Sequence, residues 1–243
     1  MGRPFSDITL YTPTSFLVGT PEYYDEVSLQ NYVSDLYVRC MNGYKPPKVT
    51  RICIQPSFYK IWDRTWKNGS IVSIAPYFEY KKYEGLEKQG KYLYILELIQ
   101  DAALQLSEEY GWDKSIFENA YKEVVESNFI FNLSSPSKMS RDKKMVANLS
   151  IEKTETITSV YANIQRADSI FKAKLFDKEN VFWYDCAYIL VKHNKWFDAD
   201  RFGIRYGKRQ INIWYSIKNN EVVLFENETQ VAKINFRKFF IFG

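Results

Sequence analysis

Residues 92–127 have the sequence YLYILELIQDAALQLSEEYGWDKSIFENAYKEVVES, and this stretch decides the fold class. In its first part, apolar residues recur at spacings of three and four and so share one helical face: Tyr92, Ile95, Leu96, Ile99, Ala102, Ala103 and Leu106. The same pattern recurs from Ile116 to Val125. Between the two parts, Gly111 suits the left-handed residue that ends a helix, and Asp113 suits the N-cap of the next. The stretch therefore predicts two helices that pack as an antiparallel pair.

The chain before this pair is expected to be extended and interrupted by turns. Short strands are predicted at residues 8–11, 36–40, 49–54 and 70–80, where apolar side chains alternate or cluster between turn residues. Pro76 argues against an uninterrupted central strand in the last of these ranges.

The chain after the pair favours β-structure. Residues 134–144 are polar and are expected to form an exposed loop. Strands without intervening helices are then predicted, which is typical of an antiparallel meander, at residues 146–151, 156–164, 170–176, 181–191, 201–206, 210–217, 221–226 and 230–242. The predicted fold is α+β, with a central antiparallel helical hairpin packed on a mainly antiparallel β-sheet. We expect an N-terminal mixed part over residues 1–133 and a C-terminal β part over 134–243, with one continuous domain as the alternative.

The composition excludes several kinds of chemistry. The 243 residues include one histidine and three scattered cysteines, which argues against a zinc site, a disulfide framework and most Cys/His or Ser/His catalysis. No glycine-rich phosphate loop or metalloprotease motif is present. We therefore expect no cofactor and no metal. A catalytic role stays open for two arrangements. One is a Cys186–His193 pair, although a cysteine in an apolar run is more commonly a buried inert thiol. The other is a carboxylate site at Asp198 and Asp200, although such residues more commonly belong to a polar turn.

The charge is divided unevenly along the chain. The formal net charge is +4, but residues 92–127 contain only two lysines against eight acidic residues. A solvated outer helix face is the simplest explanation, and an electronegative surface for a basic partner is the alternative. If a partner binds here, the residues expected to present the charge are Glu97, Asp101, Glu108, Glu109, Glu118, Glu123 and Glu126.

A second candidate surface lies near the C-terminus. Basic and aromatic residues are interleaved there, as phosphate contacts combined with base stacking would require: Arg201, Arg205, Tyr206, Lys208, Arg209 and Trp214. The same alternation is typical of any solvated antiparallel strand, so nucleic-acid binding is the alternative function rather than the leading one.

Three segments of the helical region carry a resemblance to a known group of proteins, namely residues 92–99, 107–113 and 117–121. Over about residues 77–131 the chain resembles bacterial immunity proteins of polymorphic-toxin and contact-dependent inhibition systems. The resemblance implies a non-enzymatic inhibitor that binds one cognate toxin domain in the cytoplasm, and it assigns no particular residue a role. The sequence also lacks an apolar run of about 18 residues, the length that spans a bilayer, so no membrane association is expected.

Overall fold

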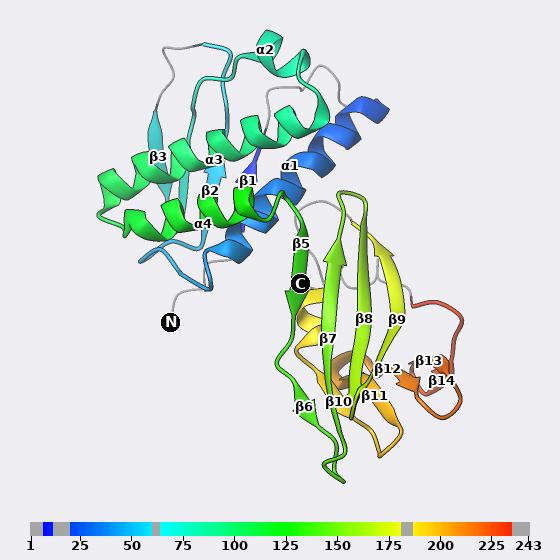
Figure 1. Cartoon of the computed structure of the whole chain (residues 1–243). Coiled ribbons are helices and arrows are strands. Elements are labelled where there is room, and N and C mark those ends of the chain that lie inside the picture. Colours follow the sequence, from blue (N-terminus) through cyan, green and yellow to red (C-terminus); the bar gives the residue numbers. More distant parts are fainter. Residues whose placement is uncertain (1–6, 12–19, 60–63, 181–186, 235–243) are drawn as a thin grey trace. The chain divides into compact units, whose positions relative to one another are not determined.

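The chain consists of two compact units, Met1–Ile130 and Phe131–Gly243 (Figure 1). The structure is a computed structural model that describes residues 7–11, 20–59, 64–180 and 187–234. These residues form an α+β structure that contains antiparallel sheets, which confirms the predicted fold class. In the described part of the chain, no helix is long and apolar enough to cross a membrane.

The first unit contains a mixed four-stranded sheet in the order β1-β2-β4-β3. β1, β2 and β4 are mutually parallel, and β3 pairs with β4 in the antiparallel direction. The elements are β1 (Asp7–Leu10), α1 (Pro21–Cys40), β2 (Arg51–Ile54), β3 (Thr65–Asn68), β4 (Ile71–Ile74), α2 (Tyr80–Glu84), α3 (Lys88–Tyr110) and α4 (Lys114–Glu126). Ile52, Ile54, Val72 and Ile74 are fully buried and alternate with residues on the other face of the sheet.

The strand predicted at residues 36–40 is wrong, because these residues form the end of helix α1. Thr20 caps this helix by accepting a hydrogen bond from the Tyr23 backbone N–H at 3.3 Å, and Pro21 occupies its first position. The buried residues recur at helical spacing over the whole segment: Leu29, Tyr32, Val33, Leu36, Tyr37 and Cys40. A helix is also what the topology needs, since two parallel strands such as β1 and β2 require a crossover connection.

The helical pair predicted over residues 92–127 is present as α3 and α4. Gly111 ends α3 in the left-handed conformation with φ 67°, and the Asp113 side chain caps α4 by accepting from the Ser115 backbone N–H at 3.0 Å. Both helices contact α1 as well as each other. The expected packing of the pair on the C-terminal sheet involves both units and stays a prediction.

The second unit contains two antiparallel sheets, one built on β5, β7, β8 and β9 with β6 beside β7, the other ordered β10-β11-β12-β13-β14. The elements are β5 (Phe131–Ser134), β6 (Lys138–Met139), β7 (Met145–Lys153), β8 (Ile157–Arg166), β9 (Ser169–Glu179), α5 (Ala187–Val191), β10 (Asn194–Trp196), β11 (Arg201–Tyr206), a 3-10 turn (Gly207–Arg209), β12 (Ile211–Ser216), β13 (Glu221–Glu226) and β14 (Thr229–Gln230).

Several local predictions for this unit need correction. The loop expected at residues 134–144 contains the end of β5 and the short strand β6. Ala187–Val191 form a helix where a strand was expected over 181–191, and residues 181–186 lie outside the described residues. A short apolar run does not distinguish a buried helical turn from a strand, which explains this error. Of the strand expected at 230–242, the described residues 230–234 contain only the end of β14 at Gln230, and residues 235–243 lie outside the described residues.

Candidate functional site

The seven acidic residues predicted as a binding surface are all exposed on α3 and α4. We call this set the acidic helix surface, and it consists of Glu97, Asp101, Glu108, Glu109, Glu118, Glu123 and Glu126. Exposure follows from the helical pattern, because the opposite face of each helix supplies buried residues such as Ile99 and Phe117. The structure therefore presents every one of these carboxylates to solvent.

The members of the acidic helix surface differ in their contacts. Glu108 pairs with Lys114 at 3.2 Å and Glu126 pairs with Lys122 at 3.7 Å, both as exposed ion pairs that contribute little to stability. Glu123 accepts a hydrogen bond from the buried Cys40 thiol of α1. Burial, followed in importance by this carboxylate, raises the pKa of Cys40 to about 12.

Glu97 and Asp101 form the part of this surface where negative charge is concentrated around an aromatic ring. Both carboxylates act on Tyr121 of α4, whose pKa is raised first by partial burial and then by these two charges. Partial burial also raises the pKa of Asp101 itself. Neither carboxylate forms an ion pair with a cation among the described residues. An approaching cation would therefore find two uncompensated carboxylates next to a phenol ring.

Exposed apolar side chains accompany these charges. Leu93 on α3 is 38 % exposed and Val125 on α4 is 43 % exposed. Such apolar residues within a charged surface are typical of protein–protein interfaces, which combine an apolar centre with a polar rim.

The basic and aromatic residues of the C-terminal sheet are brought together only in part. Arg201 of β11 lies over the Trp214 ring of β12 at 5.2 Å from the ring centroid, while its guanidinium pairs with Asp198 at 2.6 Å. The Trp214 ring also stacks on Phe225, at 5.2 Å between centroids. These contacts occupy the indole that was expected to stack on a base.

The remaining residues of this second surface lie apart from that cluster. Arg205 and Lys208 are exposed, and Arg209 belongs to the turn that follows β11. The Tyr206 ring packs against His193 at 5.0 Å between centroids. Strand alternation directs Tyr206 to the opposite face of β11 from Arg201 and Arg205. The six residues therefore do not form one continuous platform.

The two carboxylates considered for catalysis, Asp198 and Asp200, accept hydrogen bonds that hold backbone turns in place. Asp198 accepts hydrogen bonds from the backbone N–H groups of Asp200 and Arg201, both at 2.9 Å. Its pKa is lowered, since the bonds from Arg201 and from the turn outweigh the effect of its partial burial. Asp200 accepts from the Ser216 hydroxyl at 2.6 Å and from the Lys218 backbone N–H at 2.6 Å. Of the proposed Cys186–His193 pair, Cys186 lies outside the described residues.

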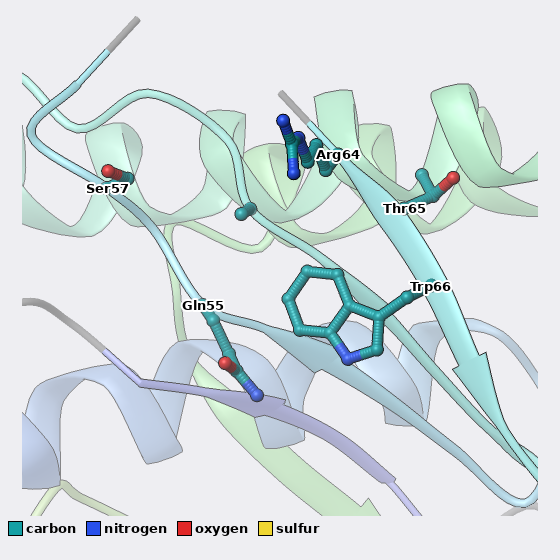
Figure 2. Close-up of a pocket in the computed structure, with 6 residues that line it drawn as sticks. Gln55, Ser57, Arg64, Thr65 and Trp66 are labelled. Atoms are coloured by element: carbon teal, nitrogen blue, oxygen red, sulfur yellow. The ribbon is translucent and has the colours of Figure 1, made fainter. Parts of the chain in front are cut away.

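A cavity of about 610 Å³ in the first unit was not anticipated from the sequence. Gln55 and Ser57 follow β2, Ala75 follows β4, and Arg64, Thr65 and Trp66 come from the start of β3. Figure 2 shows the Trp66 ring reaching across the cavity toward Gln55, with the helices on the far side of the strands. The cavity thus opens at the carboxyl ends of two parallel strands, the usual location of ligand sites in such sheets.

One sequence signal could have indicated this cavity. A polar or small residue stands directly after each of two apolar strands, Gln55 after Ile54 and Ala75 after Ile74. The signal carries information only once the strands are known to be parallel, because only then do these positions meet at one edge.

Comparison with protein-family models, with curated proteins and with solved structures finds no match to this chain. Within the described residues, no group of three or more His, Cys, Asp or Glu side chains could hold a metal ion.

Proposed function

We propose that this protein is a cytoplasmic immunity protein that binds and neutralises a basic toxin domain through the acidic helix surface. The observation that supports it best is that all seven acidic side chains singled out for binding are exposed on two adjoining helices. Complementary charge accelerates the encounter of two proteins and disfavours wrong partners. A basic toxin domain is therefore the partner that this surface favours.

The helices that present these charges are fixed by buried contacts. The Tyr37 hydroxyl of α1 donates to Gln100 Oε1 of α3 at 2.6 Å and lies 3.3 Å from the Phe117 carbonyl oxygen of α4. One side chain thus connects all three helices. A preorganised surface loses less conformational entropy on binding, which favours tight association.

The first test is whether a neighbouring gene encodes a toxin domain. That domain is then mixed with the unaltered protein and with a triple variant, Glu97→Lys, Asp101→Lys and Glu118→Lys. None of the three residues pairs with a cation among those the structure describes, so reversal disturbs no ion pair there. We expect the association rate, measured by stopped-flow mixing at low salt, to fall at least about 10-fold, because steering by complementary charge contributes factors of about 10 to 1,000. The difference should shrink as salt is added.

A matched variant separates local from overall charge. Asp25→Lys, Asp168→Lys and Glu228→Lys reverse three exposed acidic residues outside α3 and α4 and change the net charge by the same amount. This control should associate at nearly the unaltered rate. Equal losses in both variants would remove the acidic helix surface from the mechanism, and a gene neighbourhood without a toxin would contradict the immunity role.

Nucleic-acid binding through the C-terminal sheet is the second candidate. The exposed Arg205 on the same face of β11 as Arg201 favours it, since both cations could contact one phosphate backbone. Retention on immobilised single-stranded RNA and DNA that weakens steeply with salt would support it. No retention at low salt would exclude it.

A further inference from the structure

The cavity of the first unit has a floor that is set by the pairing of three chain segments. The backbone N–H of Gln55 bonds to the Ile74 carbonyl oxygen at 2.8 Å, and the N–H of Ala75 bonds to the Arg64 carbonyl oxygen at 3.0 Å. Gln55, Ala75 and Arg64 therefore lie side by side in one row across the sheet edge. The short side chain of Ala75 in the middle of this row leaves a hollow beside Gln55.

The Trp66 indole forms a flat apolar wall of this hollow (Figure 2). Trp66 pairs with Ser73 of β4, and Ser73 stands on the same face of that strand as Ala75, so the indole belongs to the face that contains the hollow. The indole is 41 % exposed, although large aromatic side chains are usually well covered in a folded protein. Among the described residues, no other ring and no cation lies against it. An exposed ring face at the wall of a cavity favours a flat aromatic ligand that stacks on it.

The Gln55 amide determines what the edge of such a ring must present. The Gln55 side chain has no hydrogen-bond partner among the described residues, so its donors and its acceptor are all left for a ligand. The edge of a heterocyclic base presents a donor beside an acceptor, which a glutamine amide meets with two hydrogen bonds. Ser57 accepts a hydrogen bond from the Tyr59 backbone N–H at 3.1 Å, and its own hydroxyl proton remains a donor.

The groups left for recognition carry no charge. Arg64 also lines the cavity, but it already interacts with another group of the chain, so its guanidinium determines nothing about the ligand. The other described lining residues are uncharged, which favours a neutral molecule. The cavity volume of about 610 Å³ is within the range of small-molecule sites, about 300 to 1,000 Å³.

We propose that this cavity binds a neutral purine, as the free base or as its nucleoside, with the ring stacked on Trp66 and its edge bonded to the Gln55 amide. A purine fits better than a pyrimidine because two fused rings cover more of the bicyclic indole, and stacking grows with the contact area. A sugar without a base would leave the indole face uncovered. A purely apolar ring would leave the Gln55 amide without a partner in a site from which it excludes water.

Isothermal titration of the full chain with adenosine, inosine, cytidine and uridine tests the proposal. At least one of the two purine nucleosides should bind more tightly than both pyrimidine nucleosides, and the matching free base, adenine or hypoxanthine, separates the two sources of the ring. Trp66→Ala should weaken that purine about 5- to 150-fold, the range expected for the loss of one base stack. Trp66→Phe should restore part of the affinity because a smaller aromatic face remains. Tyr24→Ala removes an aromatic side chain that is 53 % exposed on α1, and it should leave the affinity unchanged.

A second pair of variants tests the hydrogen bonds to the edge of the ring. Gln55→Met keeps the length of the side chain but removes its donors and its acceptor, so it should weaken the purine about 2- to 13-fold, the effect of losing one neutral hydrogen bond. Gln165→Met makes the same replacement at an exposed position of β8 in the second unit. It should leave purine affinity unchanged.

Four results would overturn the proposal. The first is that neither purine nucleoside produces heat of binding or a change in tryptophan fluorescence at millimolar concentration. The second is purine binding that Trp66→Ala leaves intact while circular dichroism shows the variant folded. The third is a pyrimidine nucleoside that binds as tightly as the purine nucleosides. The fourth is an equal loss of affinity in Gln55→Met and Gln165→Met, which would place the purine outside the cavity.

Discussion

Tyr37→Phe should destabilise the helical part of the first unit although it removes only one oxygen atom. The Tyr37 side chain is fully buried, and its hydroxyl is the donor to Gln100 Oε1 at 2.6 Å. Gln100 is itself buried, with 8 % of its surface exposed. Without the Tyr37 hydroxyl, its amide oxygen would therefore have no water molecule to replace the lost donor. Leaving a buried acceptor unsatisfied costs about 1 to 3 kcal/mol, and the nearby Phe117 carbonyl also loses a contact, so we expect about 2 kcal/mol.

Urea unfolding measures this loss. With a slope of about 2 kcal/mol per molar urea, the midpoint of the first unit should fall by about 1 M. Two compact units need not unfold together, so hydrogen exchange at the amides of α3 and α4 must show the same loss of protection.

The double variant Tyr37→Phe with Gln100→Met tests the cause. Replacing both partners by apolar groups removes the unsatisfied oxygen, so the double variant should be less destabilised than the sum of the single variants by at least about 0.5 kcal/mol. Two results would refute the reasoning. One is that the two single changes in unfolding free energy add up to that of the double variant. The other is a Tyr37→Phe variant that differs from the unaltered protein by less than about 0.5 kcal/mol, the effect of an ordinary surface substitution.

Three further predictions concern single positions. A Cβ on Gly203 would lie 2.0 Å from the Ile213 carbonyl oxygen, so Gly203→Ala should cost about 3 kcal/mol in thermal or urea unfolding, whereas Gly207→Ala, where a Cβ meets nothing within 4 Å, should be nearly neutral. Burial raises the pKa of the Cys40 thiol to about 12, against 9.0 for a free thiol. At pH 8 it should therefore react with iodoacetamide on the order of 1,000-fold more slowly in the folded protein than in urea, because the thiolate is the reactive form. Mass spectrometry of the Cys40 peptide measures both rates, and equal rates would contradict its burial. Asp113→Ala should cost about 1 kcal/mol because α4 loses its N-cap, and Asp113→Ser should restore most of it; an Ala variant as stable as the Ser variant would contradict the capping role.

The helical pair could be predicted because its signals are local. Gly111 and Asp113 mark the turn, and each helix shows its own periodicity on both sides of it. Helix α1 carries a comparable signal, with Leu29, Tyr32, Val33, Leu36 and Tyr37 at helical spacing. A window limited to residues 36–40 shows only an apolar run, which fits a strand equally well. The helical periodicity of α1 is therefore present in the sequence, but it becomes visible only over a segment longer than residues 36–40.

The cavity could not be predicted in the same way because its residues meet only through strand direction. Gln55 and Ala75 are neighbours because β2 and β4 are parallel and in register from Arg51 and Ile71 onward. An antiparallel pairing of the same strands would place them at opposite edges of the sheet. Strand direction depends on the connection between the strands, which no short stretch of sequence reveals. The acidic helix surface was accessible to prediction because its charge follows from composition alone.

The acidic helix surface and the cavity can be judged separately because they belong to different layers of the first unit. Ile52, Ile54, Val72 and Ile74 are fully buried on one face of the sheet, while Trp66 and Arg64 stand on the other, and Figure 2 places the helices behind the strands as seen from the cavity. A ligand changes the affinity of a second site only when it favours one of two arrangements of the protein. The Tyr37 hydroxyl of α1 contacts α3 and α4 on their buried side, and Tyr37 is not among the residues that line the cavity. Loss of partner binding on charge reversal of the acidic helix surface would therefore say nothing about the cavity.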